Sequence, residues 1–236
     1  MKPTHLCSTS IADCPQILDA LAEFAAGAGH EINNPLSIIN GRAQLLLREI
    51  TNPEHRQQLE IIVTQTRRAY EMIADVRFFA RPPEAEMERF HLREELEKVI
   101  KEQTPLMSEH GITLHFEFTP AGKEEYIYSD PVLLHTAVML LCNNARESLL
   151  LAEKRGDIFL RSVYGGGHWT LTFADDGGGI ADEVLPYIFD PYYSGRQAGR
   201  GLGFGLPKVW RIMQILGGNI RYKNTKQGAA FELELT

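Results

Sequence analysis

The chain has 236 residues, more than one domain usually contains, and its 44% hydrophobic and 23% charged residues are ordinary for a globular protein rather than a disordered one. Its 31 acidic and 24 basic residues give a net charge of -7, which would repel a phosphate backbone and disfavours nucleic acid as a partner. The three cysteines lack metal-ligand spacing and fit a reducing, cytoplasmic setting, and no apolar run approaches the roughly 20 residues of a membrane span.

The N-terminal third has the residue spacing of paired helices. Residues 1–14 show no periodicity, and we interpret them as a flexible tail. Apolar positions then recur in alternating steps of three and four over residues 18–50 and again over 59–80, which predicts a helical hairpin within residues 15–82. The rhythm shifts beside Pro35, where we expect a bend. Because a lone hairpin buries little apolar surface, two copies should form a four-helix bundle, making the protein a homodimer.

Residues 83–236 have a mixed pattern that predicts a second domain. Two prolines end the second helix, and the acidic stretch 84–88 is interpreted as a linker. Helical spacing follows over residues 92–109 and again from Pro131. Strand-like runs occupy residues 112–118, 125–128, 157–164 and 168–174, and a last hairpin turns near Gln227. The predicted fold is therefore α+β, with an α/β sandwich following the helical hairpin.

His30 lies on the outer face of the first predicted helix, away from its apolar seam. A neutral imidazole is nucleophilic at its unprotonated nitrogen, and a carboxylate that accepts the other N–H fixes the tautomer, so Glu31 is a candidate base. Asn34 adds an amide one turn later. A plain solvated helix face explains the same residues and stays open as an alternative. A zinc-protease helix does not, because Asn34 stands where a second histidine would be needed.

Two polar segments of the second domain are candidates for ligand binding. Asn144 and Glu147 follow the apolar run 137–142, and an amide oxygen is a ligand that Mg²⁺ accepts. Asp175 ends a predicted strand before a run of glycines, where a flat ligand could approach the backbone closely. A carboxylate at this position can accept a hydrogen bond from an adenine amine. A helix that runs into solvent and a flexible turn remain alternative readings of the two segments.

A glycine-rich loop precedes the last predicted helix, residues 206–216. Its alternating glycines and the start of the helix would present backbone N–H groups to an anion, within reach of Arg196 and Arg200. The loop is not a Walker phosphate loop, because no Gly-Lys-Ser/Thr follows. It is not a clear dinucleotide fingerprint either, because the unit lies at the end of the chain.

Taken in order, these segments resemble the conserved boxes of the sensor histidine kinases, particularly the nitrogen-regulation type. The boxes are residues 30–36, a segment ending at Ala145, and residues 175–180, 188–194 and 201–206. The resemblance implies that His30 is the phosphoacceptor, Glu31 its base, and Asn34 the residue that positions water when the kinase dephosphorylates its partner. It further implies a response regulator receiver domain as partner and an upstream sensor module or sensor protein as the source of input.

The same resemblance implies ATP and Mg²⁺ as cofactors, with Asn144 binding the metal and Asp175 recognising adenine. The other implied nucleotide-binding residues are Glu147, Gly177, Gly179, Arg196, Arg200, Gly201, Leu202, Gly203, Phe204, Gly205 and Leu206. Two alternatives use the same nucleotide fold: an ATPase clamp, and an inactive scaffold that binds a regulator without turnover. The clamp would hydrolyse ATP without labelling itself, and the scaffold would bind nucleotide without transferring label.

Overall fold

The chain divides into two structural units, Met1–Pro83 and Glu84–Thr236. The computed structural model describes residues 15–119, 125–193, 203–225 and 228–235, so the tail predicted over residues 1–14 lies outside the described ranges. The first unit is helical and the second combines helices with strands. The predicted α+β class, a helical hairpin followed by an α/β domain, is confirmed.

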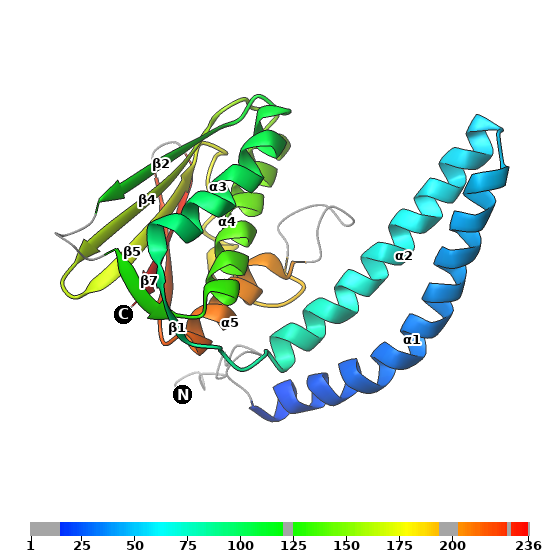
Figure 1. The fold of residues 1–236 in the computed structure, drawn as a ribbon, viewed down its shortest axis with the longest axis horizontal. Helices are drawn as coiled ribbons and strands as arrows, with labels where there is room; N and C mark the ends of the chain where they lie inside the picture. Colours follow the sequence, from blue (N-terminus) through cyan, green and yellow to red (C-terminus); the bar gives the residue numbers. More distant parts are fainter. Residues whose placement is uncertain (1–14, 120–124, 194–202, 226–227, 236) are drawn as a thin grey trace, which may run out of the picture. The chain divides into compact units, whose positions relative to one another are not determined.

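Helices α1 (Pro15–Glu49) and α2 (Pro53–Ala80) lie side by side as a hairpin in the first unit (Figure 1). The start of α2 is fixed locally. The side chain of Asn52 accepts hydrogen bonds from two of the first backbone N–H groups of α2, at 2.9 and 3.1 Å. Proline directly after this cap has its φ already set for a helix. The Asn-Pro pair therefore explains why the second helix begins where it does.

Pro35 lies inside α1 without ending it. A proline has no N–H to donate, so the carbonyl of Glu31 loses its helical partner, which weakens and bends a helix without breaking it. In Figure 1, α1 is one continuous helix that curves. Six residues before Pro35, Gly29 is buried, and a Cβ atom there would lie 3.1 Å from Cγ2 of Ile73. The small residue lets the two helices approach closely beside His30.

The apolar seam of the hairpin is only partly covered. Ala25 and Ala43 are buried, whereas Ile32, Ile39 and Leu46 keep 43%, 45% and 45% of their surface exposed. Exposed large apolar side chains at coiled-coil spacing form a surface onto which further helices could pack. Among the described helices, none combines the length and the apolar character needed to cross a membrane.

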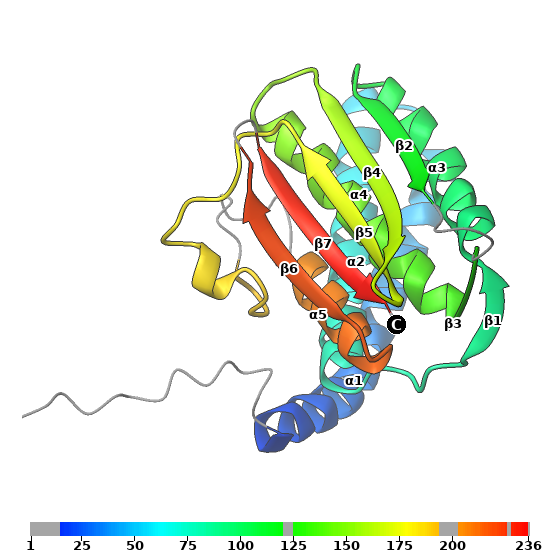
Figure 2. The ribbon, with the colours of Figure 1, turned by 90° about the vertical axis from the view of Figure 1, so that its left-hand side faces the viewer.

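A five-stranded sheet in the order β2-β4-β5-β7-β6 forms the second unit together with three helices. The strands are β2 (Thr113–Thr119), β4 (Asp157–Gly165), β5 (His168–Asp175), β6 (Asn219–Asn224) and β7 (Ala229–Leu235). The helices are α3 (Leu92–Ser108), α4 (Pro131–Leu151) and α5 (Gly205–Ile215). β2 and β4 are parallel and the other pairs antiparallel. Figure 2 shows the three helices behind the sheet, so the predicted two-layer sandwich is confirmed.

The two faces of the sheet differ in chemistry. In β4, Ile158 and Leu160 are buried while Phe159 and Arg161 are exposed, which is the alternation of a sheet covered on one face only. The buried set continues through Trp169, Leu171 and Phe173 of β5 and packs with the apolar side of α4. The uncovered face instead carries cross-strand ion pairs, such as Arg161 with Glu117 at 2.7 Å.

A second, two-stranded sheet was not predicted. Strand β1 (Glu88–His91) pairs antiparallel with β3 (Tyr126–Ser129), so Glu88 belongs to a strand and the interpretation of 84–88 as a linker was wrong at its end. Asp130 connects this sheet to α4: one carboxylate oxygen caps the helix at 2.8 and 2.9 Å, and the other accepts the N–H of Glu86 at 2.8 Å. The start of the second unit is therefore tied to the helix that carries Asn144.

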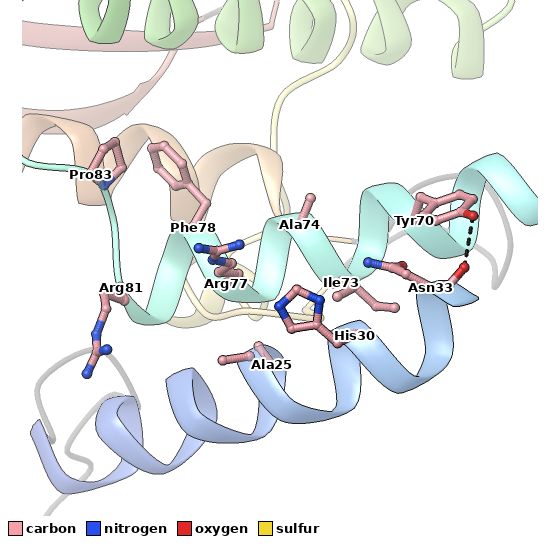
Figure 3. A pocket seen from close by; sticks show the side chains of 12 residues that line it. Ala25, His30, Asn33, Tyr70, Ile73, Ala74, Arg77, Phe78, Arg81 and Pro83 are labelled. Atoms are coloured by element: carbon pink, nitrogen blue, oxygen red, sulfur yellow. Dashed lines mark hydrogen bonds between the residues drawn. The ribbon is translucent and has the colours of Figure 1, made fainter. Parts of the chain in front are cut away.

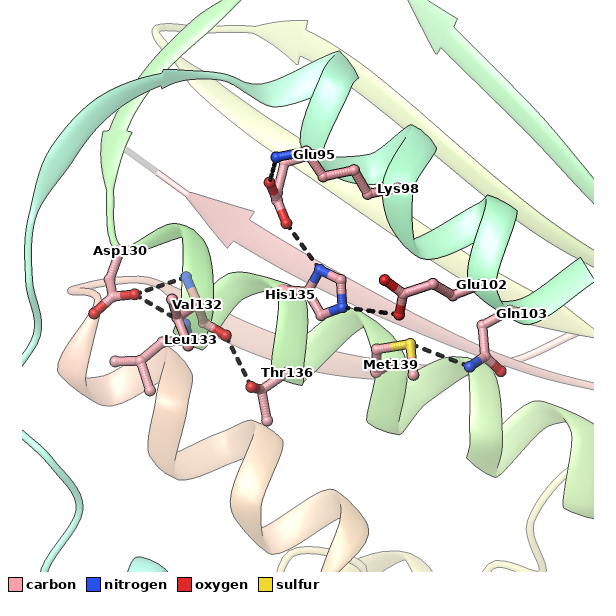
Figure 4. Close-up of polar contacts among 10 residues, drawn as sticks. All are labelled: Glu95, Lys98, Glu102, Gln103, Asp130, Val132, Leu133, His135, Thr136 and Met139. Atoms are coloured by element: carbon pink, nitrogen blue, oxygen red, sulfur yellow. Dashed lines mark hydrogen bonds and ion pairs between the residues drawn. The ribbon is translucent and has the colours of Figure 1, made fainter.

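Polar side chains fix α3 against α4 (Figure 4). Nδ1 of His135 lies 2.8 Å from Oε1 of Glu95, Nε2 lies 3.3 Å from Oε2 of Glu102, and the ammonium of Lys98 lies 2.7 Å from Oε2 of Glu95. Burial alone would raise the pKa of Glu95, but the hydrogen bonds from Lys98 and His135 outweigh it and hold the pKa below its ordinary value.

Candidate active site

His30 lines a groove formed by α1 and α2 within the first unit (Figure 3). The groove has a volume of about 560 Å³. On α1 it is lined by Ala25, Gly29 and His30, and on α2 by Tyr70 and Arg77. His30 itself is exposed, so its ring is accessible from solvent. The small residues Ala25 and Gly29 keep the His30 side of the groove open.

Glu31 and Asn34 are placed differently relative to His30. Consecutive residues on an α-helix point about 100° apart, so neighbouring side chains do not face each other. In the described structure no hydrogen bond joins the carboxylate of Glu31 to the imidazole of His30. Asn34 is one turn on from His30 and exposed, which puts its amide on the same side of α1 as the ring. Helical spacing thus places Asn34 on the same side of α1 as His30 and points Glu31 to another side.

Tyr70 connects α2 to α1 beside His30. Its hydroxyl donates to the main-chain carbonyl of Asn33 at 3.0 Å and lies 2.5 Å from the hydroxyl of Ser37 (Figure 3 shows the bond to Asn33). Tyr70 could not be found from the sequence pattern, because it is 37 residues from Asn33 along the chain and only the folded hairpin brings the two together.

Asn144, Glu147 and Ser148 lie on the last two turns of α4, where its apolar run ends. Asn144 and Glu147 are half-buried and three residues apart, so they share a face of the helix. Both carry oxygen atoms of the kind that Mg²⁺ prefers, and this ion commonly takes only one or two protein ligands beside substrate phosphates. The two residues therefore fit a magnesium site. No cluster of three or more metal-ligating side chains exists in the described part of the chain.

Asp175, at the end of β5, is buried, with 4% of its surface exposed. Its Oδ1 accepts the backbone N–H of Gly177 at 2.8 Å and the hydroxyl of Ser148 at 3.3 Å, and the carboxylate also accepts the N–H of Ala229. Burial raises the pKa of Asp175, and the three donors offset part of that effect. Three donors hold this buried carboxylate in one orientation, so it is a preorganised hydrogen-bond acceptor.

Gly177 and Gly228 let backbone pack against Asp175. A Cβ atom on Gly177 would lie 2.0 Å from Oγ of Ser148, and one on Gly228 would lie 1.8 Å from the carbonyl oxygen of Asp175. Gly179 follows in the same turn, before the N–H of Ile180 donates to the hydroxyl of Tyr222 at 3.1 Å. Ser148 and Gly228 were not predicted as site residues, although Ser148 lies one helical turn after Asn144 in the sequence.

The second glycine segment is described from Gly203 onward. Gly203 has a φ of +69°, and a Cβ atom there would meet the carbonyl oxygen of Tyr193 at 2.8 Å, so both conformation and space require glycine. Phe204 is buried, with its ring 4.7 Å from that of Tyr192. Gly205 and Leu206 open α5. Four predicted nucleotide-binding residues lie outside the described ranges: Arg196, Arg200, Gly201 and Leu202.

Two family models match separate parts of the chain. Residues 20–85 match the model described as "His Kinase A (phospho-acceptor) domain". Residues 129–236 match "Histidine kinase-, DNA gyrase B-, and HSP90-like ATPase". The first match contains His30 and Asn34, and the second contains Asn144, Asp175 and Gly203.

Similar proteins are known in sequence and in structure. The signal transduction histidine-protein kinase AtoS of Escherichia coli K12 is 27% identical over 222 residues, which are 92% of this chain and 35% of AtoS. Full-length ShkA in complex with AMPPNP superimposes with a TM-score of 0.76 at 24% identity, over 90% of this chain and 45% of ShkA. ThkA in complex with the response regulator protein TrrA gives a TM-score of 0.63 at 20% identity, over 93% and 63% respectively. The chain spans less than half the length of AtoS and ShkA.

Proposed function

The chain belongs to the sensor histidine kinases, and we propose that it uses ATP to phosphorylate its own His30 and passes the phosphoryl group to an aspartate of a response regulator. The observation that carries the proposal is the presence, in one chain, of an accessible imidazole in a hairpin groove and of a buried, preorganised carboxylate at Asp175. An ATPase clamp would need only the second of these features.

We assign nucleotide binding to the second unit. Asp175 accepts a hydrogen bond from the adenine amine, and the packed glycine turn after it lets the base approach the backbone. The N-terminus of α5 presents backbone N–H groups to the phosphates, where the helix dipole favours negative charge. Mg²⁺ held by Asn144 and Glu147 would neutralise phosphate charge as the reaction proceeds.

The chemical step is an in-line displacement. The unprotonated ring nitrogen of His30 attacks the γ-phosphorus of ATP, a nitrogen–phosphorus bond forms, and the bond to the β,γ-bridging oxygen breaks so that ADP leaves. Glu31 acts as the base after its side chain turns toward the ring. An aspartate oxygen of the regulator then attacks the phosphorus, the nitrogen–phosphorus bond breaks, and the imidazole is regenerated.

Asn34 supports a second, dephosphorylating activity of the same site. Its amide lies one turn beyond His30, where it can orient a water molecule toward the phosphorylated aspartate of a docked regulator. The shared fold with ThkA in its TrrA complex is consistent with a receiver domain as the partner. We propose dephosphorylation of the regulator as the second reaction of the kinase.

The homodimer is proposed from the exposed seam. Ile32, Ile39 and Leu46 would become buried if α1 and α2 packed against the same helices of a second copy. Input would reach the bundle from an upstream sensor module or sensor protein, and the site of action would be the cytoplasm, where ATP is available.

The proposal is tested by incubating the protein with γ-labelled ATP and Mg²⁺, beside His30→Gln and His55→Gln. His55 is a second exposed histidine of the same hairpin and serves as the matched control. Label that is acid-labile, alkali-stable, absent from His30→Gln and retained in His55→Gln supports the kinase. Hydrolysis of ATP without label would favour a clamp, and nucleotide binding without hydrolysis or label would favour a scaffold.

A further inference from the structure

The turn of α1 that carries His30 is intrinsically weak. Pro35 cannot donate to the carbonyl of Glu31, and a proline ring also crowds the preceding turn of a helix. Gly27 and Gly29 immediately before His30 have low helix propensity. A phosphoacceptor on such a segment needs support from outside α1 if its ring is to hold one direction.

Tyr70 of α2 supplies contacts on both sides of Pro35. Its hydroxyl donates to the carbonyl of Asn33 at 3.0 Å, two residues before the proline, and lies 2.5 Å from the hydroxyl of Ser37, two residues after it. The Ser37 hydroxyl can donate to the Tyr70 oxygen while the Tyr70 hydroxyl donates to Asn33, so both bonds are satisfied together. The tyrosine thus bridges the weak turn.

We propose that Tyr70 is a positioning residue for the reactions at His30, a step that rests on the proposed kinase activity. By holding residues 33–37 in one conformation, Tyr70 fixes the direction in which His30 and Asn34 leave the helix. His30 and Asn33 of α1 and Tyr70 of α2 line the same groove of the hairpin. Well-oriented groups react faster, and small misplacements of a reacting group can cost a large part of the rate.

An ordinary helix–helix hydrogen bond is the competing explanation. It would contribute to the stability of the hairpin without influencing the reaction of the folded protein. Tyr70→Phe separates the two, because phenylalanine keeps the ring that lines the groove and removes only the hydroxyl. Thr64→Val is the matched control: it removes a hydroxyl of α2 that donates only within α2, to the carbonyl of Glu60 at 2.8 Å.

The experiment measures autophosphorylation well below the melting temperature of each variant. Tyr70→Phe should lower kcat by about fivefold to tenfold, as expected for one hydrogen-bond network, with KM for ATP unchanged because the nucleotide pocket lies in the other unit. Ser37→Ala should have a smaller effect, and the double variant should resemble Tyr70→Phe, because both residues act in one network. Thr64→Val should match wild type. Unchanged kcat in Tyr70→Phe would overturn the proposal.

Hydrogen exchange provides a readout that does not depend on activity. The backbone amides of residues 31–37, apart from Pro35, which has none, should exchange faster in Tyr70→Phe than in wild type, while those of the α2 C-terminal half should not. Equal exchange in both proteins would refute the bridge. Absence of label from wild type together with accelerated exchange in Tyr70→Phe would instead point to failure of the kinase proposal, with the bridge intact as a structural contact only.

Discussion

Asn in place of Asp175 should separate nucleotide affinity from the stability of the second unit. A carboxylate has about four acceptor positions. Three protein donors use the carboxylate of Asp175, namely Gly177, Ser148 and Ala229, which leaves about one position for a ligand. Asp175→Asn keeps the shape and the acceptor oxygen, but removes the charge and turns an N–H₂ group toward a ligand that is itself a donor.

The expected loss is that of one hydrogen bond to a charged acceptor, about 1.5–3 kcal/mol, which weakens ATP binding by roughly tenfold to 150-fold. The stability of the folded second unit should not fall in the same way. Because burial raises the pKa of Asp175 in the folded state, its ionised form disfavours folding at neutral pH. The nucleotide-free Asn variant should therefore be at least as stable as wild type at pH 7, and its advantage should shrink as pH falls below the raised pKa toward the ordinary pKa of Asp.

Calorimetric titration with an ATP analogue measures the first quantity, and denaturant unfolding at several pH values measures the second. Asp176→Asn is the matched control, because it makes the same chemical change at the adjacent, half-buried position. Affinity within about threefold of wild type would show that Asp175 does not contact the base. A variant that unfolds more easily at pH 7 would show that the carboxylate is structural.

Four further variants test the fold and the assembly. Glu95→Gln should destabilise the second unit by about 1–2 kcal/mol at pH 7. Because the folded pKa of Glu95 is lowered, this difference should be full above the ordinary pKa of Glu and vanish as pH falls through the folded pKa, which unfolding at pH 7 and pH 3 would reveal. Gly27→Ala should stabilise the hairpin by up to about 1 kcal/mol, since a Cβ atom there meets nothing within 4 Å. Gly29→Ala should stabilise the hairpin less, or destabilise it. A larger increase in stability for Gly29→Ala than for Gly27→Ala in thermal unfolding would contradict this packing. Ile39→Glu should dissociate the dimer in sedimentation equilibrium, and an unchanged dimer mass would place the interface elsewhere.

The elements that follow from local pattern could be predicted from the sequence. Steps of three and four residues specify α1 and α2, and the alternation in β4 specifies a sheet covered on one face. Strand β1 could not be predicted because its four residues are mostly polar, with two half-buried, and it gains its conformation only by pairing with β3. The closest pair, His91 with Tyr126, is 35 residues apart in the sequence. A pattern within a short window holds no information about such a partner.

The same limit applies to the candidate site. His30 and Asn34 could be placed on one side of a helix from their spacing alone, and helical geometry equally implies that Glu31 points elsewhere. Tyr70 could not be found in this way, because its contacts with Asn33 and Ser37 depend on the register between two helices. Gly228 contacts the backbone of Asp175 only because β7 lies beside β5 in the folded sheet.

The proposed function depends on transfer of the γ-phosphoryl group of ATP to His30. The most direct measurement is mass spectrometry of the protein after reaction with Mg·ATP, digested under mildly alkaline conditions that preserve phosphohistidine. We expect one added phosphoryl group on the peptide that contains His30, assigned to the histidine by fragmentation, and its loss after brief acid treatment. A phosphoryl group on another residue, or none while ADP accumulates, would contradict it.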